Sequence, residues 1–135
     1  MNLATRIAKR AEEGRPIRVG MIGAGKFGTM FLAQAERQRG IHIIGICDLN
    51  PEVTRSNLAL ANWNLERYAA KSLDAAAKNS TTHVGDNWEA LVNHPAVEII
   101  IECTGNPMAA VTHILRAFDQ GKHVINATVE ADAFC

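Results

Sequence analysis

The chain has 135 residues, of which 47% are hydrophobic, 5% aromatic and 21% charged. This length and composition predict one globular domain with a mainly aliphatic core. Fourteen Lys and Arg residues balance fourteen Asp and Glu residues, which excludes an extended basic surface for nucleic acid. No apolar run approaches the roughly 18 residues of a membrane-spanning helix, and the N-terminus lacks the apolar block of a signal peptide.

The cysteines and histidines show no pattern of a disulfide framework or a metal site. Cys47, Cys103 and Cys135 are odd in number and have no metal-ligand spacing, and the five histidines are scattered along the chain. We therefore expect no metal, no catalytic role for any histidine, and a reduced, cytoplasmic protein without membrane contacts.

Hydrophobic periodicity divides the chain into alternating helices and strands. The spacing of Leu3, Ile7 and Ala11 predicts a lead-in helix that ends at Gly14, so that residues 1–16 precede the main domain. The predicted strands are 17–22, 41–47, 81–84, 97–102 and 123–126. The predicted helices between them are 27–37, two pieces of 53–78 with a break near 62–64, then 88–92 and 108–120.

This alternation predicts an α/β fold, a Rossmann-type doubly wound parallel sheet of five strands with an extra N-terminal helix. The expected strand order is 3-2-1-4-5, with a ligand crevice at the carboxyl ends of strands one and four. A sixth strand is lacking, so we expect an apolar open edge around residues 99–101 and 124–125 that favours self-association into a homo-oligomer.

A glycine-rich hexapeptide, Gly23-Ala24-Gly25-Lys26-Phe27-Gly28, lies between the first predicted strand and the next helix. In a dinucleotide site, Gly23 permits the tight turn, Gly25 lets a pyrophosphate approach the backbone, and Gly28 lets the helix pack closely on the strand. Lys26 precedes the predicted helix and Phe27 begins it, and the N-terminus of this helix attracts phosphate. A tight turn without a ligand is the simpler alternative.

Asp48 ends the second predicted strand, twenty positions after Gly28, where an acid binds the adenosine ribose hydroxyls in dinucleotide-binding folds. A carboxylate there attracts a 2′-hydroxyl and repels a 2′-phosphate, so NAD is favoured over NADP. Two alternatives remain open: Asp48 caps the turn before Pro51, or Arg55 reaches over to hold a 2′-phosphate.

The segment after the fourth strand faces the glycine loop across the predicted crevice. Thr104 and Gly105 are suited to lie along the nicotinamide ribose, because Gly105 allows a close approach. Cys103 has no histidine placed by sequence to activate it, so a small buried thiol is favoured over a nucleophile.

Several segments resemble the NAD(P)-binding domain of homoserine-dehydrogenase-like oxidoreductases. The closest likeness is to the subgroup with a C-terminal SAF domain, which includes 1-deoxy-D-xylulose 5-phosphate reductoisomerase-like enzymes. The segments that carry the resemblance are 25–28, 102–107, 121–124 and 129–132, and it covers residues 17–130. It implies NAD or NADP as the cofactor and a small hydroxy or carbonyl substrate, with homoserine, a sugar phosphate and another hydroxy acid all open.

One departure concerns catalysis. Dehydrogenases of the glucose–fructose oxidoreductase type follow Gly-Lys-His-Val with Glu-Lys-Pro, whose lysine is catalytic, whereas residues 126–130 here are Asn-Ala-Thr-Val-Glu. The catalytic residues are therefore unknown. We expect residues 17–135 to be the NAD(P)-binding domain, with the substrate domain absent. A regulatory module that binds a dinucleotide without catalysis, and a domain for another adenine-containing ligand such as a methyl donor, are the alternatives.

Overall fold

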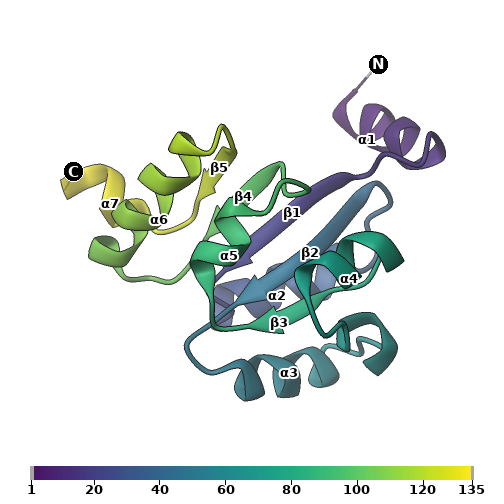
Figure 1. Ribbon diagram of the computed structural model, residues 1–135, viewed down its shortest axis with the longest axis horizontal. Coiled ribbons are helices and arrows are strands. Elements are labelled where there is room, and N and C mark those ends of the chain that lie inside the picture. The colour runs from purple at the N-terminus through teal and green to yellow at the C-terminus, as the bar shows by residue number, and fades with distance from the viewer. Residues whose placement is uncertain (1, 135) are drawn as a thin grey trace.

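The computed structural model describes residues 2–134, and these form the predicted Rossmann-type α/β fold (Figure 1). The strands are β1 (Ile17–Ile22), β2 (Ile41–Cys47), β3 (His83–Gly85), β4 (Ile99–Glu102) and β5 (His123–Asn126). They are parallel and lie in the order β3-β2-β1-β4-β5, as the alternation predicts. Cys135 lies outside the described residues.

The helices agree with the prediction except in two places, the segment 65–79 and the C-terminal end of the described residues. They are α1 (Leu3–Glu12), α2 (Lys26–Ala35), α3 (Pro51–Leu60), α4 (Leu73–Asn79), α5 (Trp88–Asn93), α6 (Pro107–Asp119) and α7 (Val129–Phe134). A short 3₁₀ helix (Leu65–Tyr68) separates α3 from α4, after Asn62 adopts a left-handed φ of 64°. Residues 97–98 lie outside β4, which begins at Ile99, and β3 begins at His83 and not at the predicted residue 81. The helix α7 was not predicted.

The sheet is covered on both faces, and each face has its own core. Met21 and Ile22 are neighbours on β1 but belong to different clusters of buried side chains, because successive strand residues point to opposite faces. Met21 packs with Leu32 of α2 and Leu58 of α3. Ile22 packs in the cluster that contains residues of α4, α5 and α6. The near-continuous apolar strands are thus those of a sheet buried on both sides.

The open edge of the sheet is narrower than predicted. β4 pairs with β1 on one side and β5 on the other, so residues 99–101 are not at an edge and that part of the prediction is wrong. β5 ends the sheet, and Ile125 on it is 54% exposed. The apolar edge therefore consists of β5 alone.

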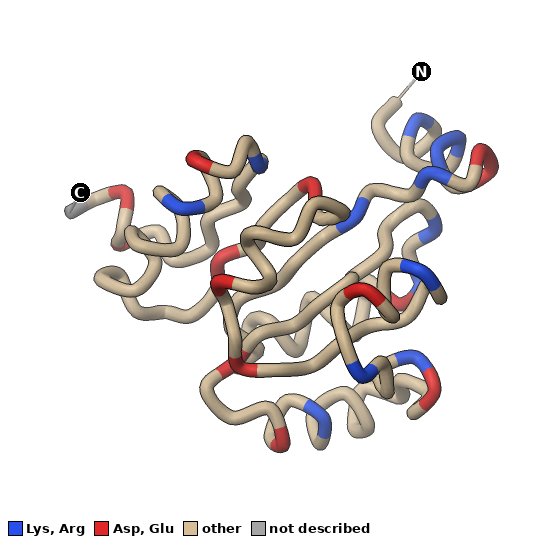
Figure 2. Tube along the Cα trace, viewed as in Figure 1, with Lys and Arg blue, Asp and Glu red and all other residues tan. Residues whose placement is uncertain are grey.

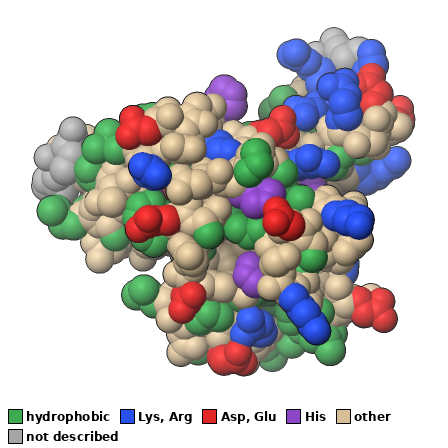
Figure 3. All heavy atoms as spheres, in the orientation of Figure 1, with side chains coloured by type: hydrophobic (Ala, Val, Ile, Leu, Met, Phe, Trp, Pro, Cys, Tyr) green, Lys and Arg blue, Asp and Glu red, His purple; other side chains and the backbone are tan. Residues whose placement is uncertain are grey.

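α1 lies at the amino end of β1, away from the carboxyl edge of the sheet (Figure 1). Arg10 anchors it through an ion pair of 3.0 Å with Glu98, whose carboxylate also accepts the backbone N–H of Arg18. Lys and Arg residues gather on and around α1 (Figure 2), whereas charges of both signs are scattered over the rest of the face seen in Figure 3. Although the net charge is zero, the positive charges are therefore unevenly distributed over the molecule.

Candidate functional site

The glycine turn between β1 and α2 has the backbone geometry that its sequence predicts. Gly23 has φ +91°, and a Cβ there would lie 2.7 Å from backbone atoms of Cys103. A Cβ at Gly28 would lie 2.8 Å from Cε of Met21, so α2 packs directly on β1. A Cβ at Gly25, by contrast, would meet no atom within 4 Å. The turn is thus closed on the protein side and open at Gly25.

The N-terminus of α2 faces this open side. Gly25 is the N-cap residue and supplies no side-chain acceptor to the first turn, so the first helical N–H groups are free for a ligand. Together with the helix dipole, they form a site for an anion such as phosphate. Lys26 lines a hollow between α2 and α3, whereas Phe27 is 59% exposed and lines neither that hollow nor the cavity along the carboxyl edge of the sheet.

Asp48, the residue after β2, joins the glycine turn to the start of α3. Its Oδ2 atom accepts the backbone N–H of Ala24 at 2.8 Å, and its Oδ1 atom accepts that of Asn50 at 3.1 Å. A carboxylate oxygen can accept more than one hydrogen bond. Asp48 therefore caps the turn, as one alternative predicted, and retains acceptor capacity toward a ligand.

Two cavities meet at Asp48. The larger has a volume of about 510 Å³ and lies along the carboxyl edge of the sheet, a volume within the range of small-molecule sites. Its wall includes Gly23, Gly25, Asp48, Leu49, Asp86, Trp88, Thr104 and His113. The second, of about 430 Å³, lies between α2 and α3 and includes Lys26, Thr29 and Asn50. Gly28 and Gly105 line neither cavity.

Arg55 does not reach either cavity. Its Nη2 atom donates to the carbonyl oxygen of Val84 on β3 at 3.0 Å, and Nη1 pairs with Glu52 one turn earlier on α3. The guanidinium group is therefore engaged on the β3 side of α3. The hypothesis that it holds a 2′-phosphate has no support in this arrangement.

Cys103 is a half-buried thiol on the wall of the larger cavity, not an activated nucleophile. Its Sγ atom donates to the carbonyl oxygen of Gly23 at 2.9 Å. Burial raises the pKa of Cys103 to about 12, assisted by the negative charges of Glu102 and Asp48. The thiol is therefore protonated at neutral pH, which agrees with the predicted role.

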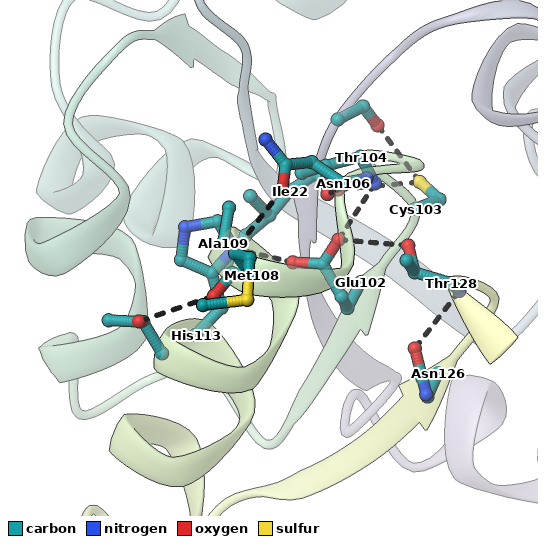
Figure 4. Close-up of polar contacts among 12 residues, drawn as sticks. Ile22, Glu102, Cys103, Thr104, Asn106, Met108, Ala109, His113, Asn126 and Thr128 are labelled. Atoms are coloured by element: carbon teal, nitrogen blue, oxygen red, sulfur yellow. Dashed lines mark hydrogen bonds and ion pairs between the residues drawn. The ribbon is translucent and has the colours of Figure 1, made fainter. Parts of the chain in front are cut away.

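The sequence prediction missed a buried polar network beside this cavity (Figure 4). Glu102, the last residue of β4, is 0% exposed, and its Oε2 atom lies 2.5 Å from Nδ1 of His113 on α6. Burial alone would raise the pKa of Glu102, but hydrogen bonds from His113 and Thr104 outweigh it and hold the pKa below its usual value. The ring of His113 also lies 4.6 Å from that of Trp88, centroid to centroid.

A signal for this network was present in the sequence. Three isoleucines, residues 99–101, predict a strand buried on both faces, and an acid that follows them directly must have a buried partner. His113 is such a partner, a structural contact that the sequence analysis did not predict. Its spacing from Glu102 has no recognisable pattern, because the contact depends on how α6 packs on the sheet.

Among residues 2–134 no three His, Cys, Asp or Glu side chains are grouped so that they could hold a metal ion. None of the helices in this range has both the length and the hydrophobicity required to cross a membrane.

Comparison with known proteins agrees with this geometry. Residues 17–126 match the family model described as "Oxidoreductase family, NAD-binding Rossmann fold". A homoserine dehydrogenase from Methylobacillus glycogenes is 27% identical over 115 residues, which are 84% of this chain and 25% of that protein.

Two solved structures show the same fold with a nicotinamide cofactor present. Myo-inositol dehydrogenase from Lactobacillus casei, in complex with NAD(H) and myo-inositol, superposes with a TM-score of 0.58 at 18% identity over 82% of this chain and 28% of that chain. Biliverdin reductase from Synechocystis sp. PCC 6803, in complex with biliverdin and NADP+, superposes with a TM-score of 0.59 at 19% identity, over 82% of this chain and 29% of that chain. The chain thus spans between 25% and 29% of the length of these proteins.

Proposed function

Because the chain belongs to the oxidoreductase family with an NAD-binding Rossmann fold, we propose that its dinucleotide serves hydride transfer between the nicotinamide ring and a small hydroxy or carbonyl substrate. One observation carries this proposal. Gly25, which is the open point of the turn and the N-cap residue of α2, borders one cavity of about 510 Å³ together with Asp48. A dinucleotide needs these three features together: close approach for the pyrophosphate, N–H donors, and an acceptor for the ribose.

The proposed contacts follow from where each residue lies. The pyrophosphate lies at Gly25 and the first turn of α2, and the adenosine ribose binds Asp48. The nicotinamide ribose lies along Thr104, which lines the cavity, and its neighbour Gly105. The full cofactor-binding set that we propose is Gly23, Gly25, Lys26, Phe27, Gly28, Asp48, Thr104 and Gly105.

We propose NAD rather than NADP as the preferred cofactor. Asp48 places a negative charge where a 2′-phosphate would lie, and like charges repel. Arg55, the cation that would offset it, is hydrogen-bonded to Val84 and paired with Glu52. Lys26 lines the hollow on the other side of Asp48 and is the remaining cation near that position.

The finer family assignment is also a proposal. The likeness to homoserine dehydrogenase from Methylobacillus glycogenes supports a homoserine-dehydrogenase-like enzyme, and the segment 129–132 on α7 supports the subgroup with a SAF domain and reductoisomerase-like members. Thr128 and its neighbours replace the Glu-Lys-Pro sequence that carries the catalytic lysine in related dehydrogenases. We therefore propose that residues 1–16 are a lead-in element, that residues 17–135 are the cofactor domain, and that the substrate-binding and catalytic groups belong to other parts of the enzyme.

Titration with NADH, followed by its fluorescence, tests dinucleotide binding by this site. In Gly25→Val the new Cβ meets no atom within 4 Å, and the side chain occupies the space proposed for the pyrophosphate, so we expect unchanged folding and no measurable binding. Ala4→Val, on the exposed and remote α1, controls for an added valine and should bind like the wild type. Equal affinity of the Gly25→Val variant and the wild type would refute the assigned site.

We also propose that the protein self-associates through the open edge at β5, where Ile125 is 54% exposed. Unpaired strand edges bind other strands unless charge or proline blocks them. Sedimentation should show a dimer that Ile125→Lys weakens, and a monomer at all concentrations would contradict this.

A further inference from the structure

Glu102 is the point where three segments of the chain meet. Its Oε1 atom accepts the backbone N–H of Thr104 at 2.7 Å and the hydroxyl of Thr128 at 3.2 Å, while Oε2 contacts His113 (Figure 4). These partners come from the β4–α6 loop, from the β5–α7 connection and from α6. A carboxylate that is 0% exposed and accepts from all three is fully engaged within the protein.

Thr128 completes this arrangement on the other side of the loop. Its hydroxyl donates to Glu102 and accepts the backbone N–H of Gly105 at 3.1 Å. Gly105 has φ +72°, a left-handed conformation that is easily lost when it is not held by hydrogen bonds. The loop therefore has one N–H bound to Glu102 and the next bound to Thr128.

The β5–α7 connection is itself firmly attached to β4. The N–H of Ala127 donates to the carbonyl oxygen of Glu102 at 2.8 Å, and the N–H of Thr128 donates to Oδ1 of Asn126 at 2.9 Å. Thr128 is only 1% exposed. The hydroxyl of Thr128 is thus held in place by the β5–α7 connection, and the position of the Thr104–Gly105 loop depends on it.

The opposite face of the loop borders the glycine turn. A Cβ at Gly23 would lie 2.7 Å from the backbone nitrogen of Thr104, so the two loops touch at that point. A small displacement of residues 104–105 would therefore change the wall of the cavity near the turn.

We propose that Glu102 and Thr128 form a clamp that positions the Thr104–Gly105 backbone for the nicotinamide half of the dinucleotide. Both are positioning residues, because they act through the loop and do not touch the cofactor. The inference rests on the proposed function, since it assigns a role within the same site. It also means that the β5–α7 connection controls how the nicotinamide half is held, while the adenosine half depends on Asp48.

The test separates the two halves by comparing NADH with ADP, which carries adenosine and a pyrophosphate but no nicotinamide ribose. Thr128→Val keeps the shape of the side chain and removes the hydroxyl, and Thr128→Ser keeps the hydroxyl. We expect the valine variant to bind NADH about five- to twentyfold more weakly, the scale of one or two lost hydrogen bonds. Its affinity for ADP should stay within about twofold of the wild type, and the serine variant should bind NADH to within about threefold of the wild type.

Every other outcome counts against the clamp. Equal loss of NADH and ADP binding in Thr128→Val would mean a general structural defect, and unchanged NADH binding would mean that the hydroxyl positions nothing. If Thr128→Val does not fold, Thr128→Ala replaces it with the same expected results. If the wild type binds neither NADH nor ADP, the proposed function itself is refuted. If the wild type binds both and Thr128→Val binds both with the same affinities, only the clamp is refuted.

Discussion

Asp48 and Glu102 are the two acids that end strands on either side of β1, and the fold uses them in opposite ways. Asp48 binds two backbone N–H groups and still borders both cavities. Glu102 is 0% exposed and binds Thr104, Thr128 and His113. The carboxylate of Asp48 is accessible to a ligand, whereas that of Glu102 is buried and hydrogen-bonded within the protein.

The difference between them arises from the elements that cover each strand end. Asp48 is followed by Leu49, which is 99% exposed, before α3 begins, so the carboxylate stays at the surface. Glu102 is covered by α6 on one side and by the β5–α7 connection on the other, which supply His113 and Thr128. Register adds to this difference, because Ile22 of β1 pairs with Cys47 on one side and with Glu102 on the other, so Asp48 lies one residue further along than Glu102.

Removal of the buried acid should have the largest effect on stability. Glu102→Ala leaves the hydroxyl of Thr128, the ring nitrogen of His113 and the N–H of Thr104 without their acceptor. Loss of one partner from a buried pair costs about 3–5 kcal/mol. Urea unfolding should show a loss of this size. A loss below about 1 kcal/mol, the scale of exposed pairs, would mean that Glu102 is not the anchor described here.

Asp48→Ala should instead reduce ligand affinity. A charged hydrogen bond to the ribose is worth about 1.5–3 kcal/mol, so NADH should bind about ten- to a hundredfold more weakly. Affinity for NADPH should fall little or rise, because the 2′-phosphate loses a repelling neighbour. The measurement is the dissociation constants of NADH and NADPH for the wild type and for Asp48→Ala. Equal weakening of both would mean that Asp48 only orders the turn through Ala24 and Asn50.

Acidification should reduce the stabilisation that ionised Glu102 gives to the fold. It should not have this effect in Glu102→Gln, which carries no ionisable group at this position. Because its pKa is lowered in the folded protein, ionised Glu102 stabilises the fold above the unfolded-state pKa of about 4.3. This stability is lost as the pH falls through the folded-state pKa. At pH 7 we expect the wild type to exceed Glu102→Gln by about 1–2 kcal/mol in free energy of unfolding.

That difference should shrink as the pH falls below about 4.3. Glu98, whose pKa is also lowered, is present in both proteins, so the comparison isolates Glu102. A difference that is constant down to pH 3 would contradict the assignment.

The sequence was sufficient for the fold and for the backbone geometry of the glycine turn. Strand order follows from alternating elements and right-handed crossovers, and the roles of Gly23 and Gly28 in the turn follow from local backbone requirements. These features depend on residues near each other in sequence.

The network around Glu102 depends on distant residues and was not predicted. His113 and Thr128 are 11 and 26 positions away, and no local pattern links them to the acid. The hydrogen bond from Arg55 to the carbonyl oxygen of Val84 on β3 could not be predicted either, because it depends on how α3 packs against β3. Sequence periodicity specifies which face of a helix is buried, but not which polar groups meet there.

The most direct test of the account is to map NADH onto the backbone amides of the ¹⁵N-labelled protein by NMR. Binding at the proposed site should shift the amide signals of Gly25, Asp48, Thr104 and Gly105, while that of Glu98, at the opposite end of the sheet, stays unchanged. Shifts confined to the Glu98 end of the sheet, or none at saturating NADH, would contradict it.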